Sequence, residues 1–188
     1  MKASPYFAPK LIYFFFRFFK EESLFKWFLK KASQESEAFV YPSTLSTSEK
    51  TILFLPHDIE STKLILSALA PILKTSNFLL VCSTPQVKII QTFRLKTPFL
   101  TYTESENRYG ENAFFRLESE IIAFNASVVL YLENTAFLPR LYLAKKSGAK
   151  YRIGFFSETS YPFLNISLKP KDNSILSKID LLLKQYQD

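Results

Sequence analysis

The chain has 188 residues, of which 47% are hydrophobic, so it has enough apolar material for one buried core and an appendage. Its three glycines stand apart, which excludes a glycine-rich phosphate loop, and its single cysteine excludes a disulfide framework. A histidine-based zinc cluster or hydrolytic triad would have to be built around the single histidine, His57. We therefore expect no metal and no cofactor.

The net charge of +7 is concentrated near the amino terminus. Residues 1–32 hold seven of the 24 basic residues and two of the 17 acidic residues, so this segment carries +5 and the rest carries +2. We call residues 1–32 the leader. Attraction to anions is expected mainly of this segment.

Aromatic and basic residues of the leader form two amphipathic patterns. The first runs from Lys10 to Glu21, with its charges on one arc of a helical wheel, and the second covers residues 22–31 in a different phase. The change of phase predicts a break near residues 21–23. Charges interrupt the apolar residues too often for a bilayer span, which needs about 20 of them.

The composition of the leader favours a helix that lies on an anionic membrane surface, with a partner protein as the alternative. Nucleic acid is not expected, because no base-stacking platform is evident. The side chains expected to form the membrane or partner surface are Lys10, Phe14, Phe15, Arg17, Phe18, Phe19, Lys20, Trp27, Phe28, Lys30 and Lys31.

Residues 33–50 are rich in Ser, Thr and Glu and lack periodicity, which predicts a linker. From residue 51 onward, apolar runs alternate with helical patterns, which predicts one domain over residues 51–188. The expected strands are Thr51–Leu55, Phe78–Ser83, Pro98–Tyr102, Ser127–Leu132, Tyr151–Phe156 and Phe163–Leu168. The expected helices are Glu60–Lys74, Pro85–Thr92, Asn112–Phe124, Ala136–Lys146 and Ser174–Tyr186.

The expected strands are apolar throughout, which is typical of a mainly parallel sheet covered on both faces. The fold class is therefore α/β, a Rossmann-like three-layer domain preceded by amphipathic helices. Cys82 lies within one of these strands and is expected to be a small buried residue. Asp58 or Ser61 is expected to cap the first helix, and Asp172 or Asn173 is expected to precede the last.

A ligand site in such a sheet lies outside the carboxyl ends of the strands. Near the first strand, the candidates for acid or base chemistry are His57, Asp58 and Glu60. Two alternatives remain open, namely that Asp58 only caps a helix and that Glu133 is a solvated loop residue. The expected binding cleft comprises Ser61, Thr62, Ser83, Glu133, Asn134, Ser157 and Glu158.

Two segments carry a family resemblance: ILFLPHDIESTKLILSALAPILK at Ile52–Lys74 and LPRLYLAKKSGAKYRIGF at Leu138–Phe155. They resemble the acceptor-side, N-terminal half of GT-B glycosyltransferases of the ADP-heptose:lipopolysaccharide heptosyltransferase family. The family's Arg-Ile-Gly strand is matched by Arg152, Ile153 and Gly154. The resemblance covers about 135 residues and implies a sugar or glycolipid acceptor.

The chain departs from this family pattern at two places. The family's Gly-Asp pair, whose Asp is a suspected base, falls on Ser61 and Thr62, and a threonine hydroxyl cannot serve as that base near neutral pH. The sequence also ends before a C-terminal donor-binding domain begins. We therefore expect a degenerate or partner-dependent protein of cell-envelope glycolipid assembly, in the cytoplasm and peripheral to the inner face of the plasma membrane. The alternative is a non-enzymatic scaffold whose leader docks a partner protein.

Overall fold

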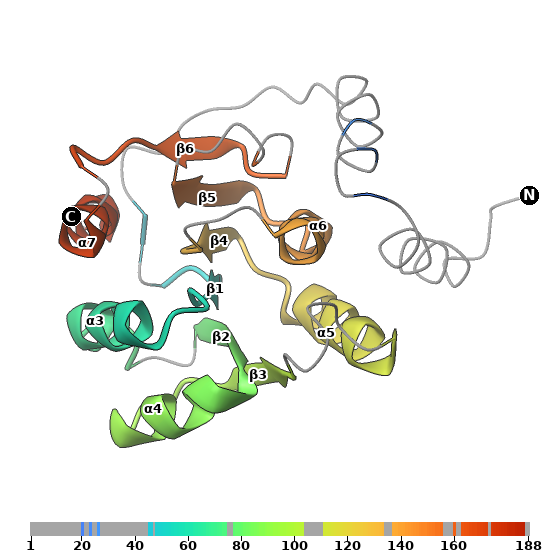
Figure 1. The fold of residues 1–188 in the computed structure, drawn as a ribbon, viewed down its shortest axis with the longest axis horizontal. Helices are drawn as coiled ribbons and strands as arrows, with labels where there is room; N and C mark the ends of the chain where they lie inside the picture. Colours follow the sequence, from blue (N-terminus) through green and yellow to red (C-terminus); the bar gives the residue numbers. More distant parts are fainter. Residues whose placement is uncertain are drawn as a thin grey trace, which may run out of the picture.

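The chain forms one parallel sheet covered by helices on both faces (Figure 1). The computed structural model describes Lys20, Ser23 and Lys26 of the leader, and then residues 45–46, 48–74, 77–103, 111–133, 137–155, 160, 163–172 and 174–186. The strands are β1 (Thr51–Phe54), β2 (Phe78–Ser83), β3 (Phe99–Tyr102), β4 (Val128–Tyr131), β5 (Tyr151–Phe155) and β6 (Ile166–Leu168). The helices are α3 (Ile59–Leu69), α4 (Val87–Thr92), α5 (Glu111–Phe124), α6 (Leu138–Lys146) and α7 (Ile175–Leu183).

The expected α/β fold is confirmed, and most elements are shorter than the sequence predicted. The first helix ends at Leu69 rather than at Lys74, because Pro71 has no N–H with which to continue the helical hydrogen bonds. The helix expected from Pro85 begins as a 3₁₀ turn over Thr84–Gln86. The last helix ends in a second 3₁₀ turn, Lys184–Tyr186.

The predicted helix caps are partly confirmed. Asp58 caps α3, because its carboxylate accepts a hydrogen bond from the backbone N–H of Ser61. Asp172 precedes the last helix as expected, and the cap of α7 is Ser174, whose side chain accepts from the backbone N–H of Ser177. Asp172 instead accepts from the backbone N–H of Ser174 and so shapes the turn that precedes the cap.

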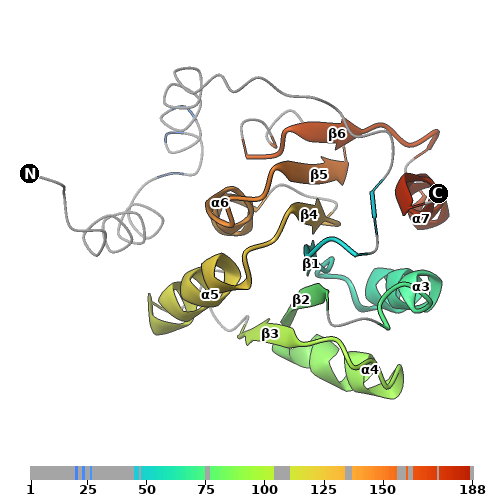
Figure 2. The same ribbon diagram turned by 180° about the vertical axis from the view of Figure 1, so that it is seen from behind.

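The sheet order is β3-β2-β1-β4-β5-β6, and every neighbouring pair is parallel. Strand order therefore reverses between β1 and β4. Figure 2 shows the same sequence of strands from behind, with α5 and α6 on one face and α3 and α7 on the other. The reversal between β1 and β4 is the position at which sheets of this class bind ligands.

A separate apolar core fills each side of the sheet. Phe114 and Leu141 lie in the core under α5 and α6, whereas Ile65, Ile90 and Ile179 lie in the core under α3, α4 and α7. Strand residues alternate between the two cores: Ile52 and Phe54 face one and Leu53 and Leu55 the other. Burial on both faces explains why the strand sequences are apolar without interruption.

The end of the expected linker packs against the domain. Leu45 is 1% exposed within the core under α3 and α7, and its backbone N–H donates to the carbonyl oxygen of Gln185 at 2.6 Å. Burying a leucine side chain stabilises a fold by about 1.5–3 kcal/mol. The chain thus joins the core before β1 begins.

Arg152 and Gly154, two residues of the Arg-Ile-Gly strand, serve packing and hydrogen bonding inside the fold. The Arg152 side chain donates to the carbonyl oxygens of Phe163 (2.8 Å) and Ala149 (2.7 Å). A Cβ atom on Gly154 would lie 2.4 Å from Cδ1 of Leu164, so a larger residue would displace that side chain. This segment therefore accounts for the way that β5 and the residues before β6 fit together.

Candidate functional site at the carboxyl edge

The loop between β1 and α3 places two carboxylates in solvent. Asp58 accepts from the backbone N–H of Ser61 at 2.7 Å. Hydrogen bonding from the Ser61 side chain, and next from this N–H, lowers the pKa of Asp58 below its ordinary value. Glu60, in the first turn of α3, pairs with Lys63 at 2.7 Å, and both side chains are at least half exposed. Asp58 is therefore ionised near neutral pH and is a weak base, while Glu60 has a cation beside it.

Thr62, by contrast, is completely buried behind this loop. Its hydroxyl oxygen lies 3.0 Å from the carbonyl oxygen of Pro56 and 2.9 Å from that of Asp58, and it accepts a hydrogen bond from Gln86 Nε2 at 2.7 Å. The Gln86 amide also donates to the carbonyl oxygen of Pro56. Thr62 thus fixes the shape of the loop from within and does not face solvent.

Gln86 also connects the loop after β2 to the loop after β1. Ser83 is 1% exposed, and its backbone N–H donates to Gln86 Oε1 at 2.7 Å in a capping box. Gln86 is not among the site residues predicted from the sequence. Ser83 and Gln86 nevertheless have the Ser-x-x-Gln spacing that is typical of a capping box.

A buried ion pair joins the loops on either side of the strand reversal. Glu133 follows β4, and its Oε2 atom binds the guanidinium of Arg140, a residue of α6; the two side chains are 8% and 3% exposed. Glu133 Oε1 accepts from the backbone N–H of His57 at 3.0 Å. Arg140 Nη1 also donates to the carbonyl oxygen of Leu55 at 3.3 Å. The ion pair therefore links the end of β4 to the end of β1.

Arg140 also contacts the end of β3. The carbon atom of its guanidinium lies 4.3 Å from the ring centroid of Tyr102, at the end of β3. Burial lowers the pKa of Arg140 to about 10, so it stays charged near neutral pH. Burial likewise raises the pKa of the Cys82 thiol to about 12, which keeps it protonated. The expectation that Cys82 is a buried strand residue is confirmed.

The residues predicted for the site therefore occupy different environments. His57, Asp58 and Glu60 are exposed and Ser61 is half-buried, so these four form the accessible part. Thr62 and Ser83 are buried, and Glu133 is held by the ion pair with Arg140. The predicted positions that lie outside the described residues are Asn134, Ser157 and Glu158 at the site, and Lys10, Phe14, Phe15, Arg17, Phe18, Phe19, Trp27, Phe28, Lys30 and Lys31 in the leader.

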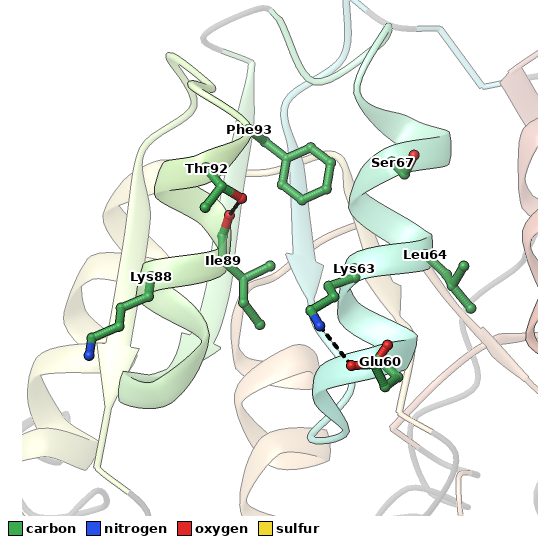
Figure 3. Close-up of a pocket in the computed structure, with 8 residues that line it drawn as sticks. All are labelled: Glu60, Lys63, Leu64, Ser67, Lys88, Ile89, Thr92 and Phe93. Atoms are coloured by element: carbon green, nitrogen blue, oxygen red, sulfur yellow. Dashed lines mark hydrogen bonds and ion pairs between the residues drawn. The ribbon is translucent and has the colours of Figure 1, made fainter.

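An open groove of about 540 Å³ lies next to this loop, on the outer surface between α3 and α4 (Figure 3). Ile89 and Phe93 point toward α3 across the groove, and the Glu60–Lys63 pair lies on the α3 side. Lys88 points away from it. The residues that line the groove are Glu60, Lys63, Leu64, Ser67, Lys88, Ile89, Thr92 and Phe93.

In the described part of the chain, no group of three His, Cys, Asp or Glu side chains is arranged to hold a metal ion. No helix there is both long and apolar enough to cross a bilayer.

Comparison with known proteins relates the chain to a glycosyltransferase fold. No family model matches the sequence, and no curated protein matches it. The crystal structure of the glycosyl transferase family 9 protein from Veillonella parvula DSM 2008 superposes with a TM-score of 0.58 and 13% identity, over 77% of this chain and 43% of that protein. The chain thus spans less than half the length of its structural neighbour, and the expected glycosyltransferase-like, Rossmann-like α/β fold is confirmed.

Proposed function

We propose that this chain is a membrane-peripheral, heptosyltransferase-like protein of cell-envelope glycolipid assembly that binds a sugar acceptor and does not transfer sugar by itself. It is either degenerate or completed by a partner that supplies the donor site. The fold of the family 9 neighbour supports the general class. The burial of Thr62 carries the proposal that the isolated chain is inactive.

The chemistry at the carboxyl edge supports an acceptor rather than a donor role. The exposed carboxylates of Asp58 and Glu60 are suited to accepting hydrogen bonds from sugar hydroxyl groups. They would repel the phosphates of a nucleotide sugar. The cation nearest to the strand reversal among the described residues, Arg140, is buried and already paired with Glu133. A neutral polyhydroxyl ligand therefore fits this edge better than an anionic one.

Thermal shift measurements on the full chain test both parts of the proposal. We expect heptose-containing oligosaccharides to raise the melting temperature, and nucleotide sugars to leave it unchanged. The double variant Asp58→Asn/Glu60→Gln keeps a capping side chain at position 58 but removes both charges, so it should lose the oligosaccharide response. Asp172→Asn is the matched control, because it removes an exposed carboxylate that precedes a different helix.

Two results would contradict the proposal. A rise of several degrees with a nucleotide sugar would show that the chain has a donor site. Equal changes in melting temperature for the wild type and the Asp58→Asn/Glu60→Gln variant would show that the oligosaccharide binds elsewhere or does not bind.

The buried ion pair supports the second candidate function, a scaffold that carries no ligand at this edge. Glu133 and Arg140 use their charges on each other and on the β1 loop, which stabilises the strand reversal from within. A scaffold would show no thermal response to any sugar. It would instead lose its partner protein, and not its membrane association, when Arg17, Lys20 and Lys30 of the leader are changed to glutamate.

A further inference from the structure

The edge of the sheet opposite the candidate site carries a row of exposed basic side chains. In a parallel sheet with helical crossovers, helices end and strands begin at this amino edge. Most of its basic residues lie in the loops that lead into β1, β2, β3 and β5. We call the row the basic edge; it comprises Lys50, Lys74, Arg94, Lys96, Lys146 and Lys150.

Hydrogen bonds between neighbouring loops hold the first half of this row together. The Thr97 hydroxyl donates to the carbonyl oxygen of Leu73, which joins the loop before β3 to the loop before β2. The backbone N–H of Thr51 donates to the carbonyl oxygen of Asn77 at 2.8 Å, which joins β2 to β1. Lys96, Lys74 and Lys50 are adjacent in sequence to Thr97, Leu73 and Thr51, so they belong to consecutive positions along the edge.

The second half continues on the other side of β1. The backbone N–H of Ser127 donates to the carbonyl oxygen of Lys50 at 2.9 Å, and the N–H of Tyr151 donates to the carbonyl oxygen of Ser127 at 3.1 Å. Lys150 directly precedes Tyr151. The row therefore runs without a gap from β3 to β5.

A favourable interaction with a helix dipole accounts for only one residue of the basic edge. Basic residues near a helix C-terminus interact favourably with its partial negative charge. Lys146 is in the last turn of α6, but the last turns of α3, α4, α5 and α7 hold no basic residue. Within the described loops that lead into the strands, the one acidic side chain is the half-buried Glu49. Of the basic edge, Lys146 faces the carboxylate of Glu118 on α5, while the described loops hold five basic side chains of the row and one acidic side chain.

Aromatic rings accompany the lysines at the same edge. Lys50 Nζ lies 5.5 Å from the ring centroid of Phe124, and Lys150 Nζ lies 5.0 Å from that of Tyr151. Phe99, the first residue of β3, is 38% exposed. The rings of Phe124 and Tyr151 are half-buried and that of Phe99 is exposed. Aromatic rings near lysine ammonium groups are also found on surfaces that rest at the headgroup boundary of a membrane.

We propose that the basic edge is a membrane-binding surface of the folded domain, which rests on anionic lipid headgroups independently of any sugar bound at the opposite edge. Lysine ammonium groups near an anionic leaflet are attracted to it, and the aromatic rings fit the boundary between headgroups and acyl chains. The chain enters the sheet at Lys50, at this same edge. The domain then presents one defined face to the lipid.

This orientation turns the candidate site away from the membrane. β1 has four residues, and a strand rises about 3.3 Å per residue, so the two edges are separated by more than about 10 Å. A sugar recognised near Asp58 must therefore project beyond the headgroup layer, as the outer sugars of a glycolipid do.

Vesicle sedimentation of the full chain tests the charge requirement. With vesicles of 70% phosphatidylcholine and 30% phosphatidylglycerol, Lys74→Glu/Lys96→Glu/Lys150→Glu should bind at least about tenfold more weakly than the wild type in 0.1 M salt. The matched control, Lys88→Glu/Lys169→Glu/Lys171→Glu, makes the same change of charge at exposed positions that follow β2 and β6. It should retain most of the binding. Equal binding by the two triple variants, whether weak or strong, would overturn the proposal.

A fluorescent label reports which edge touches the lipid, whatever the leader contributes. Pro98 is exposed at the basic edge and Pro85 is exposed at the carboxyl edge, so each is changed separately to cysteine and labelled with an environment-sensitive dye. Cys82 is fully buried and stays unlabelled. We expect vesicles to shift the emission of the label at position 98 to shorter wavelength and to leave the label at position 85 unchanged. A shift at position 85, or none at position 98, would overturn the proposal.

A binding experiment with an oligonucleotide distinguishes a lipid-binding surface from a nucleic-acid-binding surface. If the triple variant at the basic edge loses binding to a 20-nucleotide single strand but keeps its vesicle binding, the surface serves nucleic acid and the membrane proposal fails. The proposed sugar site is measured by thermal shift in the absence of lipid, so the two proposals can fail separately.

Discussion

Arg140 and Glu133 form a buried ion pair that ties α6 and the end of β4 to the backbone of the β1–α3 loop. The pair lies where strand order reverses, which in sheets of this class is the position of the ligand. Within the described residues, the buried charges at this position therefore stabilise the fold. The accessible chemistry is left to His57, Asp58 and Glu60, on the loop that the pair supports.

Removing one partner of this ion pair should destabilise the fold strongly. Arg140→Met leaves the Glu133 carboxylate buried without its cation, which costs about 3–5 kcal/mol. The double variant Arg140→Met/Glu133→Gln removes that charge and should recover part of the loss. Urea unfolding followed by circular dichroism measures both effects. The control is Lys63→Met, which breaks an exposed pair worth less than about 1 kcal/mol. A loss below about 1 kcal/mol for Arg140→Met would contradict a structural role for the pair.

Thr62 should tolerate neither an apolar nor an acidic replacement. Thr62→Val removes the hydroxyl that binds Pro56 and Gln86, which should cost about 1–3 kcal/mol. Thr62→Asp places a carboxylate in a fully buried position and should cost more, without creating sugar transfer. Thr92→Val, which removes an exposed hydroxyl, is the control for urea unfolding. If Thr62→Asp were as stable as the wild type, the buried placement of residue 62 would be wrong.

Glu118 should make the stability of the domain depend on pH. Burial raises its pKa above the ordinary 4.5, against the opposing charge of Lys146. The folded state therefore binds a proton more tightly than the unfolded state, so this contribution is complete below pH 4.5 and is lost as pH rises through the folded pKa. The free energy of unfolding of the wild type should fall relative to that of Glu118→Gln as pH increases from 4 upward.

The exposed neighbour Glu120 provides the control for this pH dependence, because it lies on the same helix. Glu120→Gln should follow the wild type across the same pH range. A constant difference between the wild type and Glu118→Gln at every pH would show that Glu118 titrates alike in the folded and unfolded states.

Cys82 should resist thiol reagents in the native protein. Burial raises the pKa of its thiol to about 12, and its Sγ atom donates to the carbonyl oxygen of Leu100 at 3.6 Å. At pH 8 a thiol-specific chromogenic reagent should react only after denaturant is added. Rapid reaction in the absence of denaturant would mean that β2 is more open than the structure shows.

The order of helices and strands could be read from the sequence, because local signals determine it. Apolar runs such as Phe78–Ser83 predicted strands buried on both faces, and Asp58 predicted the start of the first helix. Boundaries were less accurate where a proline intervenes, as at Pro71. Asp172 and Asn173 were expected to precede the last helix, and the residue that caps α7, Ser174, directly follows them in the sequence.

The candidate site was only partly predictable, because burial depends on contacts between distant segments. Thr62 and Ser83 come after strands, as the exposed residues do, but both are buried and form hydrogen bonds with Gln86. Arg140 was missed as a site residue because it stands in an apolar helix, LPRLYLA, where a basic residue looks like a surface position. Its partner Glu133 lies in a loop seven residues earlier, and sequence distance does not show that the two side chains meet.

Composition, hydrophobic pattern and chain order by themselves determined an α/β domain with a parallel sheet and a charged leader. These properties depend on which residues are apolar and on how often they recur, so they can be recognised in short windows of the sequence. Only the tertiary structure decided where strand order reverses, which carboxylates stay exposed and which lysines share one edge. Those features arise when β1 pairs with β2 on one side and β4 on the other, bringing together residues such as Lys50 and Lys150 that are far apart in the sequence.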